Sequence, residues 1–152
     1  MTSSYDEIYS KFLGLITDHK LLALSKDKAF ELMGETMKNV KGRPKINRLF
    51  DTLIYDDEIM TLSYTLVDSQ NDSYDKNFTE DVFANAMVVV WYEKLVNSDT
   101  HIKQYFGDKE TRFYSEANHM SAVKELLSQA RKFLDRDYIR DHGWNVWVKD
   151  NS

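Results

Sequence analysis

Cysteine is absent from the chain, and its absence excludes several kinds of chemistry at once. Without a thiol there is no disulfide framework, no thiolate zinc or iron–sulfur site and no cysteine nucleophile. Proline occurs once, at Pro44, and glycine five times, so long stretches contain no residue that breaks a helix. Charged residues make up 30% of the chain and are spread through these stretches, which favours long amphipathic helices.

Long apolar runs and an excess of positive charge are also absent. No run reaches the roughly 18 to 20 residues that a membrane span needs, and the start, MTSSYDEIYSKF, has acids where a signal peptide has basic residues. We therefore expect a protein made in the cytoplasm, with no membrane partner. The net charge of −5 argues against an electrostatic clamp for nucleic acid, although it leaves room for a local basic patch.

Helical spacing of apolar residues is the main pattern in the first part of the chain. Residues 4–17 and 25–42 carry apolar side chains three and four positions apart, which predicts two helices with Ser4 and Ser25 as N-caps. Gly42, followed by Pro44, ends the second helix. We expect the two helices to form an antiparallel pair.

Three further helices are predicted in the second half. The first begins after its N-cap Thr79 and is apolar on almost every side, so it belongs at the centre of a bundle. A short helix is expected between Asp99 and Gly107. A long final helix is expected from about Ser115 to His142, with apolar residues in a three-four rhythm.

Residues 46–67 are the least helical part. Residues 59–67 alternate apolar and small polar side chains, which predicts a strand, extended to a hairpin if the chain turns at residues 56–58. Residues 68–77 look like an exposed loop. The predicted fold is mainly α: a bundle of about four to five helices with a long C-terminal helix and a small β insertion around residues 46–67.

The length of 152 residues, 42% of them hydrophobic, indicates one domain with one core. We assign it to residues 1–143, with an acidic, β-containing insertion at residues 46–78. Residues 144–152 form a C-terminal tail, interpreted as a partner-binding arm.

Motifs that carry chemistry are not found. The four histidines stand singly in different elements, without a second ligand one helical turn away. A calcium loop at Asp68 and Asp72 would lack its glycine and its bidentate glutamate. The chain has no phosphate-binding glycine loop and no nucleophile elbow. We therefore predict a protein that is not an enzyme and has no cofactor and no metal site.

Three groups of residues remain as candidate contact sites. The acidic group is Asp56, Asp57, Glu58, Asp68, Asp72 and Asp75; the basic run is Lys38, Lys41, Arg43, Lys45 and Arg48; the apolar tail residues are Trp144, Val146, Trp147 and Val148. The basic run either contacts phosphates or complements the negative end of a helix dipole. Tryptophans in a terminal tail need a partner, on this chain or on another molecule.

The segment IKQYFGDKETRFYSEANHM at residues 102–120, followed by AVKELL at residues 122–127, resembles the head-to-tail connector (adaptor) proteins of tailed bacteriophages. The preceding segment FTEDVFANAMVVVWYEKL, residues 78–95, is similar to the core helix of that family, in which an N-cap threonine and a Met-Val-x-x-Trp stretch recur. The resemblance covers roughly residues 78–138, with looser agreement over the first two helices.

The resemblance implies a helical subunit of a virion, located at the interface of head and tail. Such subunits assemble into a ring, expected to contain about twelve copies, below the portal protein. The ring joins the portal to a stopper or tail-completion protein and leaves a channel through which DNA passes without sequence-specific binding. In this role the tail residues would anchor on the portal, and the acidic group would face the channel or a neighbouring subunit.

Two hypotheses from other functional classes stay open. A small helical DNA-binding or regulatory protein would use the basic run at residues 38–48 and bind duplex DNA in a salt-sensitive way. A metal-assisted enzyme built on the acidic group and a histidine would retain a bound divalent ion after purification.

Overall fold

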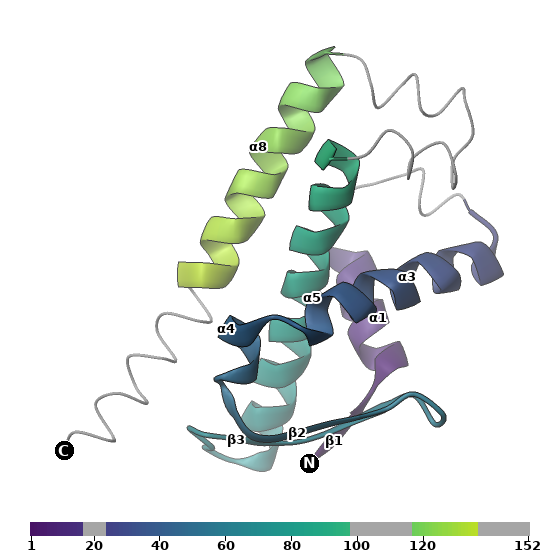
Figure 1. Cartoon of the computed structure of the whole chain (residues 1–152). Coiled ribbons are helices and arrows are strands. Elements are labelled where there is room, and N and C mark those ends of the chain that lie inside the picture. The colour runs from purple at the N-terminus through teal and green to yellow at the C-terminus, as the bar shows by residue number, and fades with distance from the viewer. Residues whose placement is uncertain (17–23, 98–116, 137–152) are drawn as a thin grey trace.

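The structure is a computed structural model, and it describes residues 1–16, 24–97 and 117–136. The described elements are, in chain order, β1 (Thr2–Ser4), α1 (Tyr5–Leu15), α3 (Lys26–Lys41), α4 (Pro44–Asn47), β2 (Phe50–Asp56), β3 (Thr61–Leu66), α5 (Asp72–Asn97) and α8 (Ala117–Phe133). This part of the chain is mainly helical and contains one small antiparallel sheet, so the predicted class is confirmed in its coarse form (Figure 1).

Helix α5 is the axis of the molecule. It is apolar around most of its circumference, and α1, α3 and α8 all pack against it (Figure 1). Its central position was predicted and is confirmed. The side chains that it buries are Val82, Phe83, Ala84, Ala86, Met87, Val88, Val89, Val90, Trp91, Tyr92 and Leu95.

The first two predicted helices are present with the expected caps. Ser4 and Glu7 form a reciprocal capping box at the start of α1, in which the Ser4 hydroxyl accepts from the Glu7 N–H and the Glu7 carboxylate accepts from the Ser4 N–H. Ser25 caps α3, which ends at Gly42. The two helices pack on α5 more extensively than on each other, so the expected antiparallel pair is not the main contact.

The sheet has the strand order β1-β3-β2, with both pairings antiparallel. The predicted alternation in β3 is confirmed, because Leu62, Tyr64 and Leu66 point into the core. The predicted hairpin is also present: β2 and β3 are joined by a turn that follows Asp56. Strand β3 therefore pairs with strands of its own chain. Strand β1 was not predicted.

The start of α5 corrects the sequence analysis. Residues 68–77 were expected to be an exposed loop, with Thr79 as the N-cap of the next helix. The helix instead begins at Asp72, and the Asn71 side chain caps it by accepting from the N–H of Tyr74 at 2.9 Å. Thr79 lies inside the helix and is 0% exposed.

The C-terminal half is described in part. Helix α8 covers Ala117–Phe133 and continues into a π-helical turn at residues 134–136. The continuation to His142, the short helix between Asp99 and Gly107, and the tail at residues 144–152 lie outside the described residues, so a long C-terminal helix is not confirmed. Among the described helices, none combines the length and the apolar character that a membrane crossing requires.

Candidate functional site

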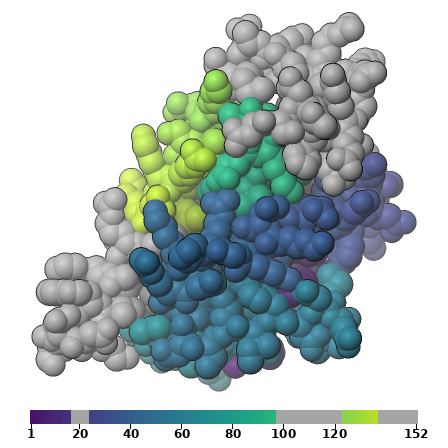
Figure 2. Space-filling view, viewed as in Figure 1, coloured from purple at the N-terminus to yellow at the C-terminus, as the bar shows by residue number. Residues whose placement is uncertain are grey.

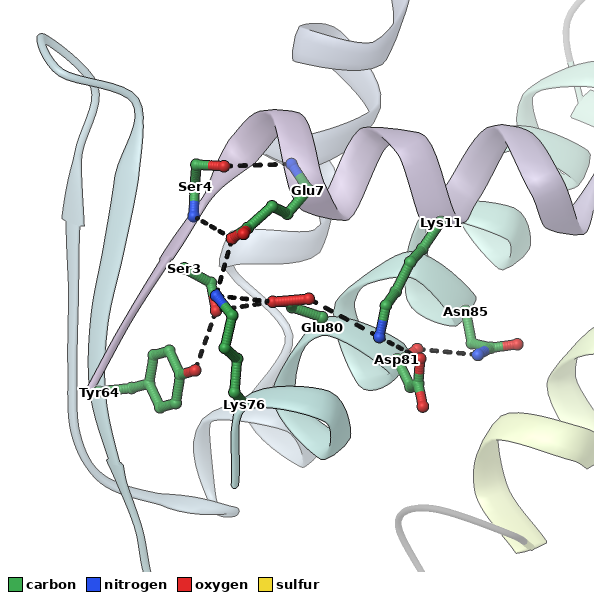
Figure 3. Close-up of polar contacts among 9 residues, drawn as sticks. All are labelled: Ser3, Ser4, Glu7, Lys11, Tyr64, Lys76, Glu80, Asp81 and Asn85. Atoms are coloured by element: carbon green, nitrogen blue, oxygen red, sulfur yellow. Dashed lines mark hydrogen bonds and ion pairs between the residues drawn. The ribbon is translucent and has the colours of Figure 1, made fainter. Parts of the chain in front are cut away.

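The most extensive polar cluster in the described structure surrounds the carboxylate of Glu80, on α5 (Figure 3). Glu80 is 4% exposed. Its carboxylate accepts a hydrogen bond of 3.1 Å from the Ser3 hydroxyl and lies 3.2 Å from the ammonium of Lys76 and 3.7 Å from that of Lys11. A buried carboxylate is stable in its charged form where cations and hydroxyl donors replace water in this way.

The cluster extends outward through neighbours of these groups (Figure 3). The Tyr64 hydroxyl lies 2.9 Å from the Ser3 oxygen; since that oxygen's own proton goes to Glu80, Tyr64 is the donor. Lys11 also binds Asp81 at 2.9 Å, and Lys76 binds Glu7 at 2.9 Å. The hydrogen bond that Lys76 donates to Glu7 lowers the pKa of Glu7 and raises the pKa of Lys76.

This arrangement holds elements of the fold together. Ser3 is 2% exposed, so a substrate carbonyl or phosphoryl group cannot reach its hydroxyl. The cluster contains no imidazole as a base, and its lysines are engaged with carboxylates. It connects β1 and α1 to β3 and α5. The sequence analysis missed it because its partners are 61 and 77 residues apart in the chain.

A second polar cluster fixes the turn between β2 and β3. The exposed Asp57 carboxylate accepts a hydrogen bond of 2.7 Å from the Tyr5 hydroxyl and one of 2.6 Å from the Lys41 ammonium. Both hydrogen bonds lower the pKa of Asp57, and the one from Lys41 has the larger effect. Burial and the nearby Asp57 raise the pKa of Tyr5, and burial raises the pKa of Tyr55 to about 12. The Lys41 ammonium lies over the rings of Tyr5 and Tyr55, 5.2 and 4.9 Å from their centroids.

The six acids predicted as one contact group do not lie together. Asp56, Asp57 and Glu58 are exposed at the hairpin turn, whereas Asp68, Asp72 and Asp75 lie beyond the other end of β3. Asp68 and Asp75 are buried, and both carboxylates accept internal hydrogen bonds: Asp68 from the Gln70 amide, and Asp75 from the Ser69 hydroxyl and the Gln70 N–H. Asp68 and Asp75 therefore offer almost no surface to a partner, and Asp72 is the exposed member of its group.

The basic run at residues 38–48 is divided among several ion pairs. The guanidinium of Arg43 binds both oxygens of Glu93, at 3.3 and 3.0 Å, and Lys41 is held by Asp57. Lys45 lies 3.6 Å from Asp135, and Lys38 lies 3.9 Å from Glu35. Arg48 is exposed. The run is therefore not a continuous patch of unpaired cations; Lys41, Arg43 and Lys45 contact three different elements.

A surface groove follows one stripe of α8, at positions three and four residues apart. Its volume is about 580 Å³, and its apolar floor includes Val96 of α5 and Leu127 of α8. Four cations line it, Lys124, Arg131, Lys132 and Arg136, together with Ser128 and one acid, Asp135. Figure 2 shows the two helices that contribute to it, α8 (yellow-green) and α5 (green), side by side. The sequence signal for the groove is the spacing of these cations on one side of a helix, which the sequence analysis did not use.

The remaining predicted candidates lie outside the part of the chain that the structure describes. Trp144, Val146, Trp147 and Val148 lie outside the described residues, as do His19, His101 and His142. In the part of the chain that is described, no group of three or more histidine and acidic side chains is arranged to hold a metal ion.

Comparisons of this chain with protein-family models, with curated proteins and with solved structures find no match. The resemblance to phage connectors therefore stands on sequence motifs alone.

Proposed function

We propose that this protein is a structural subunit of a tailed-bacteriophage connector. In this role it assembles into a ring of about twelve copies below the portal, binds a stopper or tail-completion protein, and surrounds the channel through which DNA passes. The proposal includes no reaction and no cofactor. It places the protein in the virion, after synthesis in the cytoplasm of the host.

The observation that carries the proposal is the position of the Met-Val-x-x-Trp stretch, Met87–Trp91. All five residues are buried at the centre of the bundle, and the Trp91 ring meets the Phe12 ring edge to face at a centroid distance of 6.5 Å. A motif shared with a structural family is expected to serve packing, and here its residues do. The following segment of the resemblance, in α8, packs against the same helix.

A ring subunit also needs a rigid body with chemically different surfaces on its two sides. The hairpin turn presents exposed acids, and the α8 groove presents cations around an apolar floor. Both surfaces are built on elements fixed by the core.

The test uses the purified full chain and the portal protein encoded in the same genome. Negative-stain images of the mixture should show a ring of about twelve copies at one end of the portal. A mixture in which the two proteins migrate separately at all concentrations would contradict the proposal.

Within this function, Trp144 and Trp147 are proposed to anchor the tail on the portal. A chain ending at Gly143 should lose portal binding in a pull-down, while the substitution Trp91→Phe, in the core, serves as a control for nonspecific loss of fold. Portal binding by the truncated chain at the level of the full chain would contradict the anchor.

The alternative proposal is a small helical DNA-binding or regulatory protein that uses the basic run at residues 38–48. Pairing of Lys41 and Arg43 with carboxylates weakens it, because phosphate contacts would have to displace internal ion pairs. Fluorescence anisotropy with a short duplex at low and moderate salt distinguishes the two functions. Binding that weakens steeply with salt and is lost on Arg48→Ala would favour the alternative.

A further inference from the structure

The turn between β2 and β3, residues 57–60, is held in one conformation by bonds on both sides. The Asp56 carboxylate accepts from the N–H groups of Glu58 and Ile59, at 3.1 and 3.3 Å. Met60 has a φ of 53°, in the left-handed region, and its carbonyl accepts from the Tyr5 N–H at 2.9 Å. With the Asp57 contacts to Tyr5 and Lys41, the turn is rigid before it meets any partner.

This rigid turn presents an apolar side chain to solvent. Ile59 is 68% exposed and Ile54, on β2, is 63% exposed, the two highest values among the large hydrophobic residues of the described structure. Three acids, Asp56, Asp57 and Glu58, directly precede Ile59 in the chain. An exposed isoleucine on a preorganised turn loses little entropy on binding, so it suits an anchor in a protein interface.

The α8 groove has the complementary chemistry. Val96 and Leu127 supply an apolar floor, and Lys124, Arg131 and Lys132 supply positive charge around it. The one acid of the lining, Asp135, lies 3.6 Å from the ammonium of Lys45. Arg131 lies 3.5 Å from Glu93, whereas Lys124 and Lys132 form no ion pair with any carboxylate of the described residues. An isoleucine that directly follows an exposed acid, Glu58, fits a groove that has an apolar floor and is lined by lysines.

The turn and the groove cannot meet within one chain. Figure 1 shows the hairpin turn and α8 at opposite sides of the molecule, and a separation seen in projection is a lower limit on the true separation. A contact between them must therefore join two copies. Because this contact uses two different surfaces, it is heterologous. Repeated from copy to copy, it produces either an open filament or a closed ring.

We infer that the hairpin turn of one copy docks into the α8 groove of the next copy, with Ile59 on the apolar floor and Glu58 beside Lys132. This inference rests on the proposed ring and names the contact between its subunits. It predicts repeated association of a single kind of protein, without the portal.

Cross-linking tests the position of the contact, and the absence of natural cysteine makes the experiment clean. A chain with Ile59→Cys and Ser128→Cys, oxidised at high protein concentration, should form a ladder of trimers and larger species. The control pairs Ile59→Cys with Asn39→Cys, an exposed position on α3. A ladder of equal strength in the control, dimers alone, or no cross-link in the test variant would overturn the inference.

Charge exchange tests the chemistry. Glu58→Lys and Lys132→Glu should each weaken self-association by about tenfold in sedimentation velocity. An equal mixture of the two variants should recover it, because each turn then meets a groove of opposite charge. The control is Lys38→Glu on α3, which changes the net charge as Lys132→Glu does and should have little effect on self-association. A mixture of the two variants that stays monomeric while the unaltered chain assembles would overturn the inference.

The outcomes separate this contact from the proposed function. Portal-bound rings without the cross-link between positions 59 and 128 would overturn the contact and leave the connector function standing. A ladder with no binding to the portal would support the contact and contradict the connector function.

Discussion

The hydroxyl of Tyr5, the first residue of α1, donates a hydrogen bond of 2.7 Å to the carboxylate of Asp57, 52 residues further along the chain. The bond ties the hairpin turn to the N-terminal helix. Lys41, at the end of α3, reaches the same carboxylate oxygen from a third element. The conformation of an exposed turn is thus determined by residues remote in sequence.

Substitution Tyr5→Phe should loosen this turn with little change in the rest of the fold. The ring stays in the core and the donor to Asp57 is lost, so the N–H groups of Glu58 and Ile59 should exchange with deuterium several-fold faster, as expected of a local opening. Hydrogen exchange measured by mass spectrometry gives the rate for each segment. Tyr9→Phe, on the same helix, is the matched control, because no hydrogen bond from Tyr9 to the turn is present in the described structure. Equal protection of the turn in wild type and Tyr5→Phe would contradict the role of the bond.

Stability should fall in acid because of two depressed carboxyl pKa values. Lys76 lowers the pKa of Glu7, and Lys41 with Tyr5 lowers that of Asp57, from reference values of 4.5 and 3.8. A carboxyl group whose pKa is lower in the folded state stabilises the fold above its unfolded pKa, and this contribution is lost as the pH falls through the folded pKa. Urea midpoints should therefore decrease below about pH 5. In Glu7→Gln the decrease should be smaller: the variant should be less stable than wild type at pH 7, and the difference between them should shrink as the pH falls. Parallel pH profiles for the two proteins would contradict the assignment.

The parts of the fold that could be predicted from the sequence are those set by local patterns. The capping residues Ser4 and Ser25, the ending at Gly42 and the alternation of Leu62, Tyr64 and Leu66 each depend on residues a few positions apart. Strand β1 could not be predicted in this way, since Thr2–Ser4 is a short polar segment that becomes a strand by pairing with β3. Ser3 is buried there because Glu80 and Tyr64, far along the chain, satisfy its hydroxyl.

The start of α5 shows how a good local signal can mislead. Thr79, followed by two acids, has the features of an N-cap, but tertiary burial of Thr79 and Glu80 draws the preceding residues into the helix. The real cap, Asn71, lies within a polar segment of the kind that turns also favour. Asp75, predicted as a contact residue, is buried with its carboxylate bonded to the Ser69 hydroxyl and the Gln70 N–H.

Substitution Asn71→Ala tests this helix boundary. Loss of the side-chain acceptor for the Tyr74 N–H should lower the free energy of unfolding by about 1 kcal/mol, the usual cost of removing an N-cap. Asn77→Ala, an exposed position one and a half turns into the helix, should have almost no effect. Urea denaturation of both variants gives the comparison. A loss for Asn71→Ala no greater than that for Asn77→Ala would contradict Asn71 as the N-cap of α5.

A candidate site could be predicted from the sequence where the charges of neighbouring residues define it. It could not be predicted where the ion-pair partners of those charges come from distant parts of the chain. The basic run is obvious in the sequence, yet which of its members are neutralised depends on Asp57, Glu93 and Asp135 from three other elements. The α8 groove requires both the stripe of cations on one helix and the apolar side chain of Val96 from another. Such sites form when helices and strands pack together, because packing determines which side chains lie next to a charged group.

Glu80 and Asp81, adjacent on α5, provide the sharpest test of the buried cluster because Lys11 contacts both. Glu80→Ala removes a buried carboxylate and leaves the Ser3 hydroxyl without its acceptor, so the free energy of unfolding should fall by about 3 kcal/mol. Asp81 is more exposed, and Asp81→Ala should cost about 0.5 kcal/mol, as is usual for a surface ion pair. Glu80→Gln, which keeps an acceptor for Ser3, should lie between them. Urea denaturation at pH 7 ranks the three variants, and a cost for Asp81→Ala equal to that for Glu80→Ala would show that burial does not set the value of this cluster.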